Sequence, residues 1–196
     1  MKEIWKHNFA YNNWILKNVQ DKKRILYVGC GDGRLIFELT NEHNLLTGID
    51  LNKESIATAK NNNKYNNVSF IEGDFLSYDF KEKYDAIIFV ASIHHLNMKE
   101  ALKKAKELLN QNGLIIIVGL SNPSTLFDWL LEIGRFIPSG IISKIKHVTD
   151  SEDLNLTVSY DIPKMSYIRK VCQKEIPNYK IKYGLHYRYL LTWENK

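Results

Sequence analysis

The sequence predicts an α/β domain in which an open, parallel sheet is covered by helices on both faces. Short apolar stretches typical of buried strands alternate with longer stretches of helical periodicity through the first 120 residues. A glycine-rich loop follows the first of these strands, and the second strand ends in an aspartate. At 196 residues, the chain is long enough to bury both faces of such a sheet within one domain.

The expected elements follow one another at a regular rhythm. The clearest helical pattern covers residues 98–109, where apolar side chains fall on one face and lysines on the other. Strands are expected at residues 25–28, 45–49, 68–71, 86–90 and 114–118, and helices at 3–19, from 33, at 53–64 and at 98–109. A further helix at 164–175 precedes two strands, 180–183 and 187–193.

Residues 121–163 interrupt this rhythm and are too long for a simple connection. We expect them to form an inserted cap that lines an apolar pocket. A second interpretation is an amphipathic helix that contacts a membrane surface through Arg135, Lys144 and Lys146 beside aromatic residues. A third is a helix pair packed on the domain or against a second copy.

Composition limits the class of protein. The net charge is +5, but lysines alternate with acidic residues, so a nucleic-acid partner is possible and not favoured. Two cysteines, Cys30 and Cys172, have neither disulfide nor metal-ligand spacing, which suits a reduced, cytoplasmic setting. The N-terminus lacks the apolar core of a secretory signal, and the apolar run 114–118 is too short to span a bilayer.

The glycine-rich loop is typical of a site for a nucleoside-bearing cofactor. Gly29, Gly31 and Gly33 form a G-x-G-x-G pattern, whereas a dinucleotide fingerprint requires glycine at the position of Arg34. The loop therefore suits a ligand without a pyrophosphate. Asp50, at the end of the second strand, is placed to bind a ribose diol; its alternative role is to cap the helix that follows.

Five stretches in register carry a family resemblance. Residues 28–33 and 48–50 resemble the first two motifs of the class I (Rossmann-like) S-adenosylmethionine-dependent methyltransferases, and 72–75, 84–96 and 112–118 resemble three later motifs. The resemblance covers about residues 20–120 and resumes near the C-terminus. It implies a seven-stranded, mostly parallel sheet whose last strand is antiparallel, in a single domain over residues 1–196 with the cap after the fifth strand.

The resemblance also implies a set of cofactor-binding residues. In that set Asp50 binds the ribose, Asp74 accepts from the adenine amino group, and Leu51 packs against the adenine. The complete set is Tyr11, Gly29, Cys30, Gly31, Gly33, Asp50, Leu51, Asn52, Asp74, Phe75 and Val90. Besides Asp50, two members have ordinary structural alternatives: Tyr11 as core of the first helix, and Asp74 as a turn residue.

His94 and His95 follow the fourth strand, where the resemblance places the methyl-transfer chamber. Some small-molecule O-methyltransferases carry a similar pair, and a neutral imidazole can take a proton from a hydroxyl. Relatives without an assigned base carry the same residues, however. We take His95 as the candidate catalytic residue, in a reaction that depends mainly on positioning.

The expected function is transfer of a methyl group from S-adenosylmethionine to a small, partly apolar molecule, without a metal. Modification of RNA or tRNA is the main alternative. A nicotinamide-dependent oxidoreductase is less favoured because of Arg34 and because no Tyr-x-x-x-Lys pair lies at a strand end. A nucleoside-binding module without catalysis is the remaining interpretation.

Overall fold

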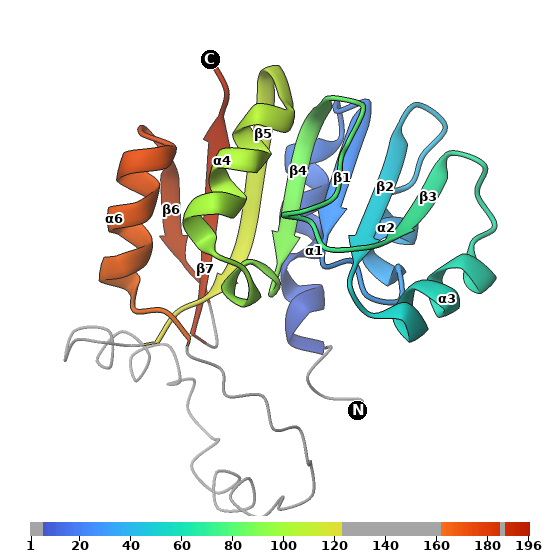
Figure 1. The fold of residues 1–196 in the computed structure, drawn as a ribbon, viewed down its shortest axis with the longest axis horizontal. Helices are drawn as coiled ribbons and strands as arrows, with labels where there is room; N and C mark the ends of the chain where they lie inside the picture. Colours follow the sequence, from blue (N-terminus) through green and yellow to red (C-terminus); the bar gives the residue numbers. More distant parts are fainter. Residues whose placement is uncertain (1–5, 123–161, 185–186) are drawn as a thin grey trace, which may run out of the picture.

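The protein folds around one seven-stranded sheet with the strand order β3-β2-β1-β4-β5-β7-β6 (Figure 1). The computed structural model describes residues 6–122, 162–184 and 187–196. The strands are β1 (Arg24–Val28), β2 (Leu45–Asp50), β3 (Val68–Glu72), β4 (Tyr84–Val90), β5 (Leu109–Leu120), β6 (Lys180–Tyr183) and β7 (Arg188–Glu194).

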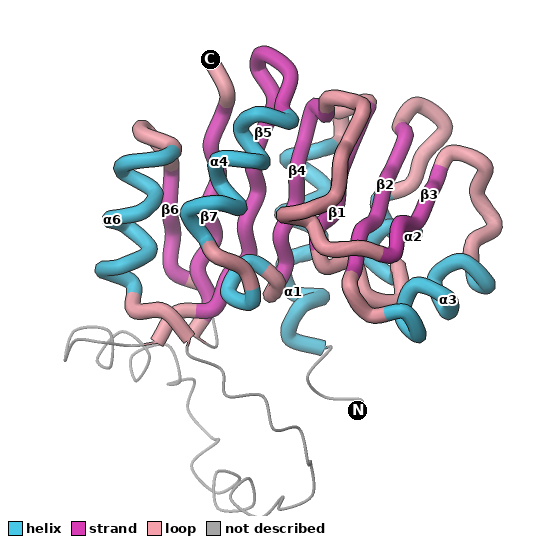
Figure 2. Tube along the Cα trace, viewed as in Figure 1, coloured by secondary structure: helices cyan, strands magenta, loops and turns pink. Residues whose placement is uncertain are grey.

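Helices cover both faces of this sheet, and Figure 2 shows α4 and α6 on the face opposite α1. The helices are α1 (Lys6–Val19), α2 (Arg34–Leu39), α3 (Lys53–Asn62), the 3₁₀ turn η1 (Ile93–His95), α4 (Met98–Leu108) and α6 (Met165–Glu175). Alternate residues of β1 supply the two cores: Leu26 packs with α4 and α6, and Ile25 packs with α1, α2 and α3. Both side chains are fully buried.

The strand directions place the functional edge. β1, β2, β3, β4 and β5 pair in parallel, and only β7 runs antiparallel, between β5 and β6. The chain leaves β1 toward β2 on one side and reaches β4 on the other, so the order reverses at β1. In open sheets of this kind, ligands bind outside the carboxyl ends of the strands at such a reversal. The predicted seven-stranded topology is confirmed.

Element boundaries agree with the sequence expectations to within two residues, except around the fifth strand; residues 3–5 of the expected first helix lie outside the described residues. The fifth strand begins at Leu109 rather than residue 114, because Leu109 already pairs with Tyr84 before a register shift. Asn112 has a positive φ of 61° within this range. Asn63 is the C-cap of α3 and has an extended conformation. The expected cap lies outside the described residues except for its first two and last two positions.

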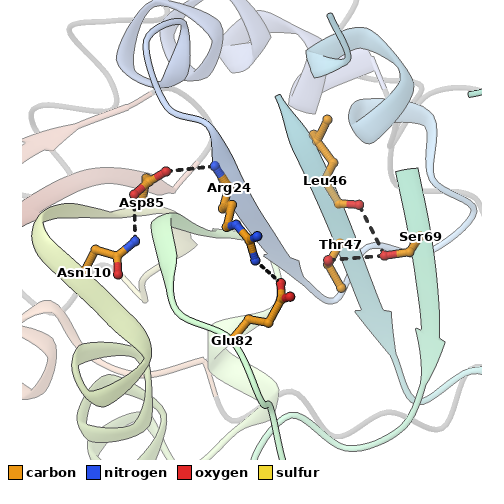
Figure 3. Close-up of polar contacts among 7 residues, drawn as sticks. All are labelled: Arg24, Leu46, Thr47, Ser69, Glu82, Asp85 and Asn110. Carbon is orange, nitrogen blue, oxygen red and sulfur yellow. Dashed lines mark hydrogen bonds and ion pairs between the residues drawn. The ribbon is translucent and has the colours of Figure 1, made fainter. Parts of the chain in front are cut away.

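Side chains tie the strands together near the amino edge of the sheet (Figure 3). The Asp85 carboxylate accepts hydrogen bonds from the Arg24 backbone amide at 2.9 Å and the Asn110 side-chain amide at 2.8 Å (Figure 3). Arg24 also pairs with Glu82. These contacts join β1, β4 and β5 at the amino edge. The opposite, carboxyl edge is formed by the loops that follow the parallel strands.

Within the described residues, no helix is both long enough and apolar enough to cross a membrane.

Candidate active site

The glycine-rich loop turns sharply where β1 ends and is fixed against β2. The backbone amides of Gly29 and Cys30 donate to the Ile49 carbonyl at 2.8 and 3.2 Å. Gly29 has a φ of 73°, and a Cβ at this position would lie 2.4 Å from the Cβ of Ser92. Only glycine therefore fits where the loops after β1 and β4 approach each other.

Asp50 lies at the centre of this edge. One carboxylate oxygen accepts from the Gly31 backbone amide at 2.8 Å, and the other accepts from the Asn52 backbone amide at 2.8 Å. The side chain of Asn52 accepts from the Ser55 amide at 2.7 Å and is the N-cap of α3. Helix capping thus falls to Asn52, and the Asp50 oxygens retain capacity for further donors.

A cavity of about 520 Å³ opens beside Asp50, within the size range of small-molecule sites. It lies where the ends of β1, β2 and β4 meet the loop after β3. The lining residues are Val28, Gly29, Ile49, Asp50, Leu51, Asn52, Gly73, Asp74, Phe75, Ala91, Ser92, His95 and Leu96. The structure thus brings seven of the residues predicted from the sequence to one cavity.

Two apolar residues of this cavity differ sharply in burial. Leu51 is 68% exposed, whereas Phe75 is 3% exposed and packs edge-to-face on Phe89. Asp74 accepts from the Leu76 backbone amide at 3.0 Å, which orients one oxygen inward along its own loop. An exposed leucine, a fixed aromatic ring and a carboxylate together suit a flat, partly polar ring system.

Five predicted cofactor residues do not line this cavity: Tyr11, Cys30, Gly31, Gly33 and Val90. Tyr11 is buried in the α1 core, and a Cβ on Gly184 would lie 2.7 Å from its hydroxyl. Burial, followed by the nearby Asp50 charge, raises the pKa of Cys30 to about 12, so the thiol stays protonated. Gly31 reaches the site only through its hydrogen bond to Asp50.

The two neighbouring histidines of η1 line different cavities. Their ring centroids are 4.1 Å apart in η1. His95 lines the cavity beside Asp50, whereas His94 lines a second cavity of about 270 Å³. Burial, together with the charge of His95, lowers the pKa of His94 to about 4, so His94 is neutral near pH 7.

Several lining residues were missed by the sequence analysis. Ser92 is buried, and its hydroxyl donates to the Val28 carbonyl at 2.6 Å, which joins the ends of β4 and β1. Ala91 has a φ of 51°, an unusual conformation for a residue with a side chain. Two signals were available for Ser92: it lies two residues after the predicted strand 86–90, and it falls within the stretch 84–96 that carries the family resemblance. Among the described residues, no group of three or more His, Cys, Asp or Glu side chains could hold a metal.

Comparison with known sequences places this chain in a family. The model of a methyltransferase domain family matches residues 19–177. An uncharacterized methyltransferase of Alkaliphilus oremlandii is 29% identical over 169 residues, which span 79% of this chain and 77% of that protein. One from Bacillus cytotoxicus is 32% identical over 117 residues, 57% of this chain and about half of that relative (55%).

Solved structures show the same fold. A protein of Pyrococcus horikoshii has a TM-score of 0.71 at 18% identity and covers all of this chain and 92% of its own. The magnesium protoporphyrin IX methyltransferase of Synechocystis, crystallised with bound S-adenosylhomocysteine, has a TM-score of 0.64 at 17% identity, covering 97% and 83%. The fold and the family model together define a class I S-adenosylmethionine-dependent methyltransferase. The chain belongs to this methyltransferase domain family.

Proposed function

We propose that the protein transfers the methyl group of S-adenosylmethionine to a small, partly apolar acceptor, with the donor bound in the cavity beside Asp50. The position of Asp50 carries this proposal. Its carboxylate stands at the end of β2, next to the strand-order reversal, and is held by two backbone amides. A carboxylate fixed in this way can accept both hydroxyls of a ribose.

The remaining lining residues suit the other parts of the donor. In our proposal, the adenine lies between the exposed Leu51 and the buried Phe75, with Asp74 as acceptor for its amino group. The methionine part follows the loop that begins at Gly29, a residue that lines the cavity. The methyl group then faces Ser92 and His95 at the end of β4.

The chemistry requires little from the protein beyond placement. A lone pair of the acceptor forms a bond to the methyl carbon, while the electrons of the sulfur–carbon bond return to sulfur and yield S-adenosylhomocysteine. The acceptor atom loses its proton to solvent or to the candidate base His95. Holding the acceptor in line with the sulfur and excluding water provides most of the acceleration.

Titration calorimetry with purified protein tests the donor site. We expect S-adenosylmethionine and S-adenosylhomocysteine to bind and NAD to show no heat. Asp50→Ala should weaken donor binding by about 100-fold, because two hydrogen bonds to a charged group are lost. Asp79→Ala removes the carboxylate of an exposed aspartate outside the cavity and is the matched control. Binding of NAD without the sulfonium donor would overturn the proposal.

An RNA or tRNA acceptor is the second candidate, favoured by the net charge of +5. Release of S-adenosylhomocysteine should be measured with a panel of small acceptors and with bulk tRNA. The proposal expects turnover on small molecules. Turnover on tRNA, with binding that falls steeply as salt rises, would move the assignment to RNA modification.

A further inference from the structure

A second cavity adjoins the proposed donor site across η1. It measures about 270 Å³ and lies between the start of α4 and the elements α6 and β7. Its lining residues are Ile93, His94, Leu96, Asn97, Met98, Pro163, Tyr167 and Tyr189. Leu96 lines both cavities, so a molecule in the second one is next to whatever fills the first.

Tyr189 provides an unusual polar group in this cavity. It pairs directly with Gly119 across β5 and β7, and a Cβ on Gly119 would lie 2.3 Å from the tyrosine ring. Glycine at this point therefore lets the ring cross over β5 toward η1. Tyr189 is 0% exposed, and within the described part of the chain its hydroxyl has no hydrogen-bond partner.

A buried hydroxyl without a partner is unfavourable unless a ligand or another group forms a hydrogen bond with it. A buried polar group without a partner costs roughly 1–3 kcal/mol, and most buried hydroxyls in native proteins are paired. Replacing Tyr189 by phenylalanine would remove that cost without changing the shape of the core. Tyr189 instead carries a hydroxyl that has no partner among the described residues, on a ring that is part of the cavity wall. A hydroxyl, carbonyl or amide group of a ligand in this cavity would supply the missing partner.

The chemistry of the walls limits the ligand. None of the described residues that line this cavity is a lysine, arginine, aspartate or glutamate. The polar groups there are the hydroxyls of Tyr167 and Tyr189, the amide of Asn97 and the imidazole of His94, among apolar side chains. His94 is neutral near pH 7, because burial lowers its pKa to about 4. From the described walls of this cavity, a charged ligand would gain no opposite charge to offset the hydration that it loses.

We propose that this second cavity binds the methyl acceptor, and that it selects a neutral molecule whose hydroxyl, carbonyl or amide group is held by the Tyr189 hydroxyl. This proposal rests on the proposed function, since it requires a donor in the neighbouring cavity. It makes Tyr189 a specificity-determining residue. Phosphorylated, carboxylated and ammonium-bearing molecules are expected to be rejected.

Matched small probes test the selectivity of the cavity. Phenol and benzamide are neutral, whereas benzoate and benzylamine have similar shapes and opposite charges. Ligand-observed NMR titrations are run with S-adenosylhomocysteine present. The neutral probes should bind with dissociation constants near 1 mM, and the charged probes at least about tenfold more weakly. Equal or tighter binding of benzoate or benzylamine, or no binding of either neutral probe, would overturn the proposal.

Two tyrosine variants test the role of the hydroxyl. Tyr189→Phe should weaken phenol binding by about 3- to 10-fold, the range expected for one neutral hydrogen bond. Tyr65→Phe removes a hydroxyl from a tyrosine that packs on Phe37, outside the cavity, and should leave phenol binding unchanged. Unchanged binding to the Tyr189 variant would contradict the assignment.

The same titrations separate this proposal from the donor assignment. Calorimetry with S-adenosylhomocysteine should give the same affinity for wild type and Tyr189→Phe, because Tyr189 does not line the donor cavity. If the wild type does not bind S-adenosylhomocysteine, the proposed function is refuted, and the acceptor role of the second cavity is refuted with it. Normal donor binding with failed probe binding would refute the acceptor site alone.

Discussion

Gly29 determines how closely the loops after β1 and β4 can approach. An alanine there must adopt the left-handed conformation and press its Cβ against that of Ser92, 2.4 Å away. The strained φ and the overpacking together should lower the free energy of unfolding by about 2–4 kcal/mol. Urea unfolding measures this loss. Gly73→Ala is the control, because its added Cβ would meet no atom closer than 3.4 Å.

A second substitution separates packing from backbone strain. Ser92→Gly in the Gly29→Ala background removes the Cβ that causes the contact and leaves the positive φ in place. We expect a double-mutant cycle to recover about 1 kcal/mol or more of non-additive stability. Additive losses would show that the loops do not touch as described.

His94 makes stability depend on pH in the acidic range. Its pKa falls from about 6.5 in the unfolded chain to about 4 in the folded protein, chiefly through burial. Between these values the unfolded state binds a proton that the folded state does not. The free energy of unfolding should therefore fall as pH decreases from about 6.5 to 4, by up to about 3 kcal/mol before solvent screening.

Chemical denaturation across this pH range measures how the free energy of unfolding depends on His94. For His94→Gln, the free energy of unfolding should change less steeply with pH than for the wild type. His43→Gln changes an exposed histidine in the loop after α2 and should keep the wild-type dependence. Identical slopes for wild type and His94→Gln would contradict the assignment of the lowered pKa.

At the scale of elements, the amino edge of the sheet depends on Asp85. Burial raises its pKa, but hydrogen bonds from Asn110 and from the Arg24 and Lys23 amides outweigh this effect and lower it overall. The stabilisation that Asp85 provides is thus complete above the pKa of this group in the unfolded chain. It is lost as pH falls through the lowered pKa of the folded protein. Asp85→Asn should cost about 1–2 kcal/mol at pH 7.

The difference between wild type and Asp85→Asn should shrink as the solution is acidified below about pH 4. Thermal unfolding at several pH values measures it. Asp79→Asn, which changes an exposed carboxylate paired with Lys81, should follow the wild type throughout. A constant difference down to pH 2 would mean that the charge of Asp85 has no part in joining β1 and β4.

Periodicity predicted most elements, because the strands of a covered parallel sheet and the apolar face of α4 are local patterns. The early start of β5 was not predictable, since Leu109 is held by Tyr84, a partner distant in sequence. The roles of Gly29 and Asp50 could be predicted from the sequence, because their spacing depends only on the loop and the strand that contain them. Ser92 was missed because its hydroxyl bonds to β1, and Ala91 because its amide bonds to Val118 of β5; both partners are distant in sequence.

The cavity near Tyr189 was not predicted either, because it depends on which residue of β5 faces the ring. The antiparallel register of β5 and β7 sets Gly119 opposite Tyr189, and nothing in either segment alone reveals that pairing. For Tyr11, burial against Gly184 is in keeping with its alternative role in the core. A contact between Tyr11 and the cofactor stays a prediction.

At the scale of the whole molecule, a ligand that binds only the folded sheet must stabilise it. S-adenosylhomocysteine at 100 times its dissociation constant should add about 2.7 kcal/mol to the free energy of unfolding. For a chain of this size that corresponds to a rise in Tm of roughly 5–11 °C. Scanning calorimetry with the wild type should show this rise, and Asp50→Ala should lose most of it. NAD should leave Tm unchanged.

The central claim is that the carboxyl edge beside Asp50 holds the donor. A crystal structure with S-adenosylhomocysteine tests it most directly. The account predicts ribose hydroxyls on the Asp50 carboxylate, adenine between Leu51 and Phe75, and sulfur turned toward Ser92 and His95. Density for the nucleoside elsewhere, or a ribose without contact to Asp50, would contradict it.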